Sequence, residues 1–369
     1  MRDALAERLL AEIMGWSPED VARERPSLQA MATYKYDQYQ QFSPGMRFVE
    51  SLAVWLGNFE TLEERHVAYE FVKRSLVFIS AAEIRHLVSI AYPDHIRPIL
   101  LREAASLLSI PEYQVGKIAN STEFKVLRRK SLFLGLSDGA HIDDFRRVSG
   151  LSNEQVHVDY QMEDKTAGDL GTKLRQDIEA FTVQPKDAGE TSFELVFLLN
   201  DFSGSSDTLL REEDGKVQGK VARAMDRVVR WQQQQPPLVA KGAKVFVILY
   251  VATQTALRNL RQRLSSLCPS EWPRCEVEAM YVLNDDIRVT PLNSPQFDAI
   301  LMKYYDPQIM DAHLRKGSSD VIHGYAGCSL PVVLSHNTPN NSVYLLWASK
   351  PNLRTHALFP RVSRHREDV

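Results

Sequence analysis

The fold is decided by residues 194–211, which read Glu194-Leu-Val-Phe-Leu-Leu-Asn-Asp-Phe-Ser-Gly-Ser-Ser-Asp-Thr-Leu-Leu-Arg211. Leu195 to Leu199 is a continuous apolar run of strand length, as expected for a strand buried on both faces of a parallel sheet. Short polar residues follow up to Thr208, and a helical pattern begins at Leu209. Backbone amides of such a loop, together with the first N–H groups of a following helix, favour an anion. The stretch therefore predicts a phosphate-binding loop between a strand and a helix.

Further apolar runs extend this strand into a sheet. They lie at residues 131–136, 244–252 and 276–283. Helical patterns alternate with them, at residues 141–148, 216–231 and 253–267, and residues 151–181 read as mostly helical. Strands alternating with helices at this spacing are typical of right-handed parallel α/β sheets. We therefore expect an α/β fold whose ligands bind beyond the carboxyl ends of the strands, where the polar loop lies.

The sequence divides into three parts by its character. Residues 1–128 are rich in helical patterns and hold no polar residues at a spacing that dictates chemistry, so we expect an all-helical scaffold or docking domain. Residues 129–350 form the expected parallel-sheet α/β domain. Residues 351–369 carry several arginines and read as a basic, flexible tail.

Composition excludes several classes of protein. The 369 residues carry a net charge of −3, which gives no overall field for nucleic acid or an anionic membrane. The three cysteines show neither a disulfide framework nor zinc-ligand spacing. No apolar run reaches the length of a membrane span. We expect a soluble, cytoplasmic protein that neither enters a membrane nor binds nucleic acid through its net charge.

The polar loop resembles the phosphoribosyl diphosphate loop of phosphoribosyltransferases. In that family, an apolar strand precedes two acids, a variable stretch, a glycine, a small residue and a threonine. Asp201 matches the second acid and Thr208 the closing threonine, whereas Asn200 stands in place of the first acid and Ser206 in place of the glycine. Asparagine can still hydrogen-bond a hydroxyl, but it removes a negative charge from a site that stabilises a cationic ribosyl transition state.

The chain resembles more closely the phosphoribosyltransferase-like proteins of the PRTase-CE type, found in bacterial conflict and anti-phage operons, some of them retron-associated. The resemblance covers roughly residues 130–348 and rests on four segments: residues 133–140, 200–205, 324–331 and 336–341. In that group Asn-Asp replaces the acid pair, so Asn200 favours this subgroup. The resemblance implies a phosphoribosyltransferase-like fold, a role in defence, and a protein partner encoded nearby that docks on the helical domain.

The resemblance also implies roles for the polar residues. The expected catalytic residues are Asp201, which would hold ribose hydroxyls or a Mg²⁺ ion through its bound water, and His336, as general acid or base. The expected phosphate- and ribose-binding residues are Asn200, Ser203, Gly204, Ser205, Ser206, Asp207 and Thr208. The alternative for this loop is a turn that caps a helix with Asp207 or Thr208. Arg211 and Lys220 could neutralise phosphates, although a charged face on a surface helix is the more common explanation.

Two further segments each have two interpretations. Ser137, Asp138 and Gly139 follow the first expected strand of the α/β domain, where the resemblance implies a pyrophosphate loop, and they read equally well as a plain β-turn. Asn337, Asn340 and Asn341 would contact the base or leaving group beside His336, or would form an Asn/Pro turn held by its own side chains.

Two functions of different classes fit these observations. The first is an effector that binds phosphoribosyl diphosphate or a nucleotide and acts at the anomeric carbon, as a phosphoribosyltransferase-like glycosyl transferase or a nucleotide-cleaving enzyme. The second is an inactive subunit that senses a nucleotide and controls a partner effector. The single acid at Asp201 favours sensing, whereas His336 favours catalysis, and the sequence leaves the choice open.

Overall fold

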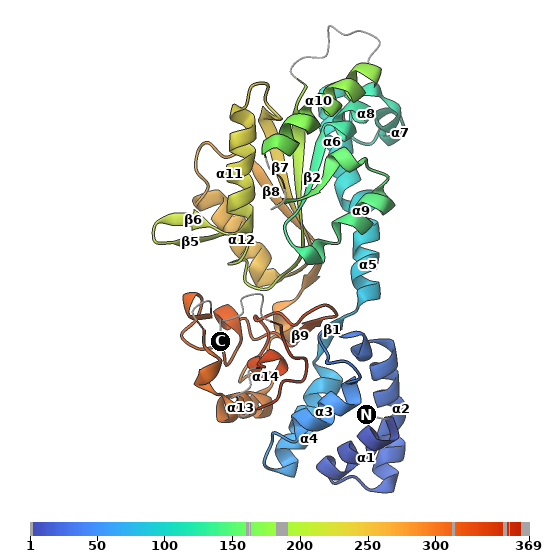
Figure 1. Ribbon diagram of the computed structural model, residues 1–369, viewed down its shortest axis with the longest axis vertical. Coiled ribbons are helices and arrows are strands. Elements are labelled where there is room, and N and C mark those ends of the chain that lie inside the picture. The colour runs from blue at the N-terminus through green and yellow to red at the C-terminus, as the bar shows by residue number, and fades with distance from the viewer. Residues whose placement is uncertain are drawn as a thin grey trace. The chain divides into compact units, whose positions relative to one another are not determined.

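The computed structural model of the protein describes residues 3–159, 162, 164–181, 191–311, 314–349, 353 and 355–362. The chain divides into two compact units, which are described separately (Figure 1). Unit 1 contains Met1–Glu83 and Asn284–Val369, and unit 2 contains Ile84–Leu283. Within the described ranges, none of the helices has the length and apolar character needed to cross a membrane.

The helices and strands of unit 1 come from both ends of the chain. They are α1 (Asp3–Met14), α2 (Pro18–Tyr34), α3 (Phe48–Leu56), α4 (Leu62–Arg74), β1 (Val77–Ile79), α13 (Pro295–Tyr304), β9 (Val332–Leu334) and α14 (Tyr344–Trp347). The pairing of β1 with β9, in parallel, joins the two ends. These compact units do not follow the limits at residues 128 and 350 that the sequence suggested, because residues from both sides of those limits fold together. As functional domains, the expected ranges stay a prediction.

Unit 2 begins with helices and continues as an α/β fold with a parallel sheet. Its helices are α5 (Ala81–Ile90, which starts at the unit boundary), α6 (Arg97–Leu108), α7 (Val115–Asn120), α8 (Thr122–Arg129), α9 (Ile142–Ser149), α10 (Asp164–Phe181), α11 (Lys220–Gln233) and α12 (Gln254–Ser266). Its strands are β2 (Ser131–Gly135), β3 (Val156–Val158), β4 (Phe193–Ser203), β5 (Arg211–Glu213), β6 (Lys216–Gln218), β7 (Val239–Thr253) and β8 (Cys275–Leu283).

Five of these strands form one parallel sheet in the order β3-β2-β4-β7-β8. This architecture confirms the expected α/β fold. The apolar run of β4 lies between two neighbours and is buried along its length, as the sequence predicted. Val196 and Leu198 face α10 and α11, where they join one hydrophobic cluster. Phe197 faces the other side and stacks on Phe133 of β2, at 5.0 Å between ring centroids.

Three local predictions are corrected. The strand at Leu195–Leu199 continues to Ser203, so Asn200 to Ser203 belong to β4 and are not loop residues. β3, which pairs with β2, lies within residues that read as helical. The helix expected from Leu209 does not form there. Instead, the chain makes the antiparallel hairpin β5–β6, and α11 begins only at Lys220.

The core of unit 1 is rich in aromatic side chains and includes residues that the sequence predicted to form a flexible tail. Trp55 and Phe359 are fully buried, and Phe359 stacks on Phe48. Ser51 Oγ donates a hydrogen bond to Leu358 O at 2.6 Å. Ala357, Leu358 and Phe359 are therefore packed into the fold, because their apolar side chains complete its core. Residues 351, 352, 354 and 363–369 of the expected tail lie outside the described residues.

Candidate functional site

The sheet of unit 2 reverses its order between β2 and β4. β3 lies on one side of β2, whereas β4, β7 and β8 follow on the other side. In open parallel sheets, ligands bind beyond the carboxyl ends of the two strands at such a reversal. The turn at Ser137–Gly139 follows β2, and Asp201 lies near the end of β4. The structure therefore brings together two of the predicted segments at the edge where this fold places ligands.

Asp201 lies against the turn that follows β2. Its Oδ1 accepts a hydrogen bond from Ser137 Oγ at 2.7 Å. A methyl group on Gly139 would overlap Oδ2 of the same carboxylate, so only glycine leaves room for it. Tyr250 of β7 donates from its hydroxyl to Ala140 O at 2.8 Å and so holds the end of the turn. Burial, and then the Asp201 charge, raise the pKa of Tyr250, which keeps its hydroxyl a neutral donor.

Asn200 faces the other side of the sheet and is fully buried. Its Nδ2 donates to Phe202 O at 2.8 Å, and its Oδ1 accepts from Lys220 Nζ at 3.2 Å. The two positions that the resemblance assigned to ribose hydroxyls therefore differ. Asp201 offers a carboxylate next to the turn, whereas the side chain of Asn200 bonds to the protein on both of its polar atoms.

Arg263 of α12 fixes the loop that follows β4. Its Nη1 lies 3.0 Å from Ser206 Oγ and 2.7 Å from Asp207 Oδ1, and it donates to Leu210 O at 2.7 Å. Ser205 Oγ accepts a hydrogen bond from Asp207 N at 3.3 Å. The side chains of Ser205, Ser206 and Asp207 thus stabilise the loop from within.

The end of β4 and the loop after it have features that suit an anion. Ser203 Oγ is buried and has no hydrogen-bond partner among the described residues. Ser206 has a left-handed backbone, with φ of +73°, as occurs in nests whose amides bind anions. Gly204 O accepts from Thr253 Oγ1 at 2.8 Å, which ties the loop to the start of α12. Thr208 is exposed at the end of the loop.

The first amides of α11 are used by the protein. Lys220 N donates to Thr208 O at 3.0 Å, and Val221 N donates to Leu209 O at 2.9 Å. The expectation that a helix N-terminus directly after the loop supplies donors to a phosphate is therefore wrong for these two amides. The alternative that Asp207 or Thr208 caps the helix is also wrong, because the N-cap of α11 is Gly219.

The third predicted segment, His336 to Asn341, belongs to unit 1. His336 is half-buried, and its carbonyl oxygen accepts from Gln41 Nε2 at 2.8 Å. Asn337 Oδ1 accepts from the next amide of the chain at 3.0 Å, and Asn340 O accepts from Tyr325 N at 2.7 Å. Asn341 Nδ2 donates to Tyr325 O at 3.1 Å. Of these contacts, the one from Thr338 N to Asn337 Oδ1 lies within the turn, whereas the others join the segment to Gln41 and Tyr325. The catalytic and base-binding roles of the segment and the self-held Asn/Pro turn all stay predictions.

Three residues around the site were not predicted from the sequence: Tyr250, Thr253 and Arg263. Thr253 was expected only as the N-cap of α12, and it does accept from Ala256 N at 2.9 Å. Its second bond, to Gly204, comes from the pairing of β4 with β7. Arg263 stands in an ordinary amphipathic helix, so no sequence signal sets it apart from the other arginines of α12.

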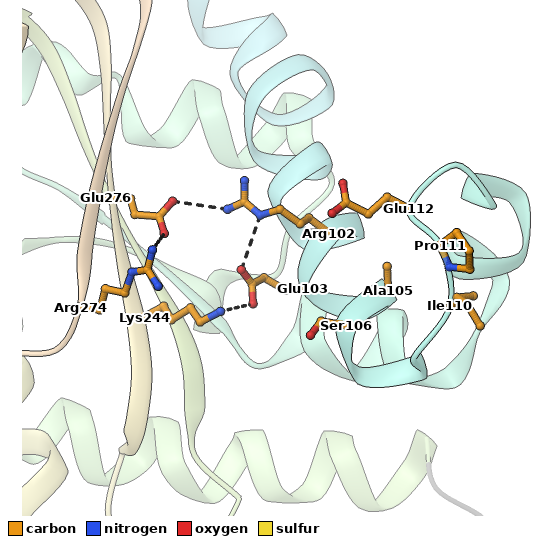
Figure 2. Close-up of a pocket in the computed structure, with 10 residues that line it drawn as sticks. All are labelled: Arg102, Glu103, Ala105, Ser106, Ile110, Pro111, Glu112, Lys244, Arg274 and Glu276. Carbon is orange, nitrogen blue, oxygen red and sulfur yellow. Dashed lines mark hydrogen bonds and ion pairs between the residues drawn. The ribbon is translucent and has the colours of Figure 1, made fainter.

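A charged pocket of about 680 Å³ lies near the amino ends of β7 and β8 (Figure 2). Its charged lining residues are Arg102, Glu103, Glu112, Lys244, Arg274 and Glu276. Figure 2 shows that Arg102, Lys244 and Arg274 pair with Glu103 and Glu276 across α6 and the sheet. Lys244 lies 2.6 Å from Glu103, Arg102 lies 3.5 Å from Glu276, and Arg274 lies 3.3 Å from Glu276. The charges of this pocket largely neutralise each other.

The donors of the site bear on whether it could hold a magnesium ion. Among the described residues, no group of three or more His, Cys, Asp or Glu side chains could hold a metal. Mg²⁺ is often held by one or two carboxylates together with substrate phosphates. Asp201 at the site and Asp138, exposed in the adjoining turn, provide two carboxylates. They fit a site in which substrate phosphates supply the remaining ligands, and they do not fit a site made of protein ligands alone.

Comparison with known proteins gave one match. A sequence model of the family described as PRTase-CE matches residues 52–361, which is more than four fifths of the chain. No curated protein and no solved structure matches the chain. The matched range includes the whole sheet of unit 2 and the His336–Asn341 segment of unit 1.

Proposed function

The chain belongs to the PRTase-CE family, and from this premise we propose that it binds a phosphorylated ribose, as phosphoribosyl diphosphate or a nucleotide, at the carboxyl edge of β2 and β4. The protein is phosphoribosyltransferase-like in family and fold. The observation that carries the proposal is the hydrogen bond of 2.7 Å from Ser137 Oγ to Asp201 Oδ1, which joins the turn after β2 to the end of β4. This bond supports the proposal because it joins the Asp201 carboxylate to the Ser137–Gly139 turn at the edge where parallel sheets bind ligands.

The proposed chemistry takes place at the anomeric carbon. In phosphoribosyl diphosphate, a nucleophile would form a bond to C1 of the ribose while the bond from C1 to the pyrophosphate oxygen breaks. The ribose becomes cationic in the transition state, and the Asp201 carboxylate would stabilise that charge and accept from a ribose hydroxyl. Asp201 would help to hold a Mg²⁺ ion through its bound water, and that ion would supply positive charge to offset the charge of the leaving pyrophosphate. Ser203 at the end of β4 and the 204–208 loop would hold the 5-phosphate.

The cellular role that we propose is antiviral defence in a bacterium, with the protein as effector. This role rests on the resemblance to proteins of conflict operons, as does the partner protein that we expect to dock on residues 1–128. Its test is a plaque assay in cells that express the chain with its neighbouring genes, beside cells that express Asp201→Ala. Equal plaque numbers for both strains and for cells without the genes would contradict the role in defence.

A second function, nucleotide sensing without turnover, is favoured by Asn200. Its amide bonds to Phe202 and Lys220, so one of the two acids that hold ribose in the related enzymes is replaced by a residue engaged with the protein. Such a site would bind a phosphorylated ribose and transmit its occupancy to a partner.

One experiment separates these two functions. The protein is incubated with phosphoribosyl diphosphate or with nucleotides, and free base and pyrophosphate are measured by mass spectrometry beside calorimetric binding. We expect Asp201→Ala to weaken binding by about tenfold, as for a lost hydrogen bond to a charged group. Binding without product would support the sensor and exclude the enzyme. If no phosphorylated ribose binds at millimolar concentration, both functions are wrong.

A further inference from the structure

The position of Lys220 depends on the β5–β6 hairpin. The hairpin extends away from the polar loop after Leu209, and the chain returns to that loop at Gly219, whose φ is +124°. A Cβ atom on Gly219 would overlap the Leu209 carbonyl, so the close return needs glycine. The amide of Lys220 then bonds to Thr208 O, the last residue of the polar loop. The hairpin therefore places the first residue of α11 directly beside the loop.

The side chain of Lys220 extends back to β4. Its Nζ donates to Asn200 Oδ1 at 3.2 Å, while Asn200 Nδ2 donates to Phe202 O at 2.8 Å. The Phe202 carbonyl accepts a hydrogen bond and the Lys220 ammonium donates one, so residue 200 must provide a donor for the first and an acceptor for the second. Asparagine provides both, whereas an aspartate would turn a carboxylate oxygen toward the Phe202 carbonyl. The amide at position 200 thus matches its surroundings better than the acid of the related enzymes.

Lys220 is bound at both ends to the candidate site, through its backbone to Thr208 and through its ammonium to Asn200. Lys220 is half-buried, and its bond to Asn200 holds the ammonium group beside the last residues of β4. An ammonium group carries three donors and binds phosphate oxygens as a point charge. Ser203 Oγ, buried without a partner among the described residues, provides a neutral donor from the same strand end.

We propose that Lys220 is the residue that recognises the phosphate of the ligand, and that Asn200 positions Lys220 and does not bind the ribose. This inference rests on the proposed function, because it concerns the same site. The site then reads its ligand in two separate ways. Lys220 and the loop bind the phosphate, and Asp201 is the carboxylate that binds the sugar.

Two probes separate these two contributions. Inorganic phosphate carries only the group that Lys220 recognises, whereas ribose 5-phosphate carries the sugar as well. We expect Lys220→Gln to weaken the binding of both probes by about 10- to 100-fold, the effect of losing a charged hydrogen bond. Asp201→Asn should weaken the binding of ribose 5-phosphate, because Asp201 binds the sugar. The affinity for inorganic phosphate should stay within about twofold, which corresponds to less than half a kcal/mol. Lys220→Arg should keep most of the phosphate affinity because the charge remains.

Asn200→Asp tests the positioning role. The proposal expects weaker binding of both probes, because a carboxylate neutralises Lys220 and loses the bond to Phe202 O. If Asn200 instead bound the ribose, the change would alter ribose 5-phosphate and leave inorganic phosphate as it was. A purely structural role would lower the melting temperature and leave the affinity of the folded variant for both probes unchanged.

Lys216→Gln is the matched control, since Lys216 is an exposed lysine of β6 only four residues away. We expect it to bind both probes like the unaltered protein. Equal affinities of Lys220→Gln and Lys216→Gln, in variants that fold as judged by circular dichroism, would overturn the inference while the proposed function stands. If neither inorganic phosphate nor ribose 5-phosphate binds the unaltered protein, the inference and the proposed function are both wrong.

Discussion

Unit 2 carries two polar regions at opposite ends of its parallel strands, and they are built in different ways. The candidate site at the carboxyl ends of β2 and β4 is held by hydrogen bonds between side chains and backbone, such as those of Tyr250 to Ala140 and of Arg263 to Leu210. The charged pocket near the amino ends of β7 and β8 is held by ion pairs between side chains, such as Lys244 with Glu103.

The difference shows which region is prepared for a ligand. In the charged pocket, the three cations pair with Glu103 and Glu276 of the same cavity, so an entering anion would have to replace existing partners. At the candidate site, the bonds fix the backbone of the turn and of the loop, and a buried serine hydroxyl lacks a partner among the described residues. A polar cavity alone therefore does not indicate function, and a rigid backbone around few polar groups is the stronger sign.

The largest effect is expected from Gly139→Ala. A methyl group at this position overlaps Asp201 Oδ2, so either the turn or the carboxylate must move. Overpacking of this kind costs about 1–3 kcal/mol, which corresponds to about 5- to 150-fold in affinity if the cost falls on the binding geometry. Calorimetry with ribose 5-phosphate measures the change.

Gly116→Ala is the control for this prediction. Gly116 lies in α7 of the same unit, and a Cβ atom built there meets nothing within 4 Å. Alanine in a helix is about 1 kcal/mol more favourable than glycine, so this variant should be as stable as the unaltered protein or slightly more stable, with unchanged binding. Full affinity of Gly139→Ala would show that Asp201 does not need its present position.

An intermediate effect is expected from Arg263→Ala. The change removes the contacts to Ser206, Asp207 and Leu210 and leaves the Leu210 carbonyl without this donor. We expect a loss of about 1–3 kcal/mol of unfolding free energy and a loss of affinity of about three- to tenfold, because the loop is ordered by these bonds before the ligand arrives. Urea denaturation and calorimetry measure the two quantities.

Arg261→Ala on the same helix controls for the loss of an arginine, since its one hydrogen bond, to Val277 O, is long at 3.4 Å and exposed. It should change affinity by less than about twofold, within the range typical of exposed substitutions. If both variants bind equally well, the loop does not depend on Arg263 for its binding conformation.

The sheet could be predicted from the sequence because its strands are strongly patterned. The run Leu195–Leu199 is apolar without interruption, and the helix after β7 opens with a threonine cap, so both appear where they were expected. β3 could not be found, because a strand of three residues at the edge of a sheet gives no periodicity to read. The aromatic segment around Phe359 was read as a tail, because its burial depends on helices more than 300 residues earlier in the chain.

The candidate site could be predicted only in part, for a related reason. Ser137 and Asp201 were expected as site residues that follow two strands of one parallel sheet, and the structure brings them into contact. The bond of Lys220 to Asn200 was not, because the pattern from Leu209 onward continued like a helix and hid the hairpin. Tertiary contacts decided which of the polar residues face a ligand and which bond to the protein.

The smallest effect is expected from the charged pocket. A double-mutant cycle of Glu103→Gln and Lys244→Met measures the coupling of the pair, which lies at 2.6 Å. Because the Lys244 side chain is 40% exposed, water and salt screen the interaction, and we expect a coupling of about 0.5–1 kcal/mol that shrinks as ionic strength rises. Urea denaturation at two salt concentrations provides the measurement. Binding of ribose 5-phosphate should stay the same in all three variants, since the pair lies near the opposite end of the strands from the candidate site. A loss of binding in Glu103→Gln with unchanged stability would reverse the comparison and make the charged pocket the functional region of unit 2.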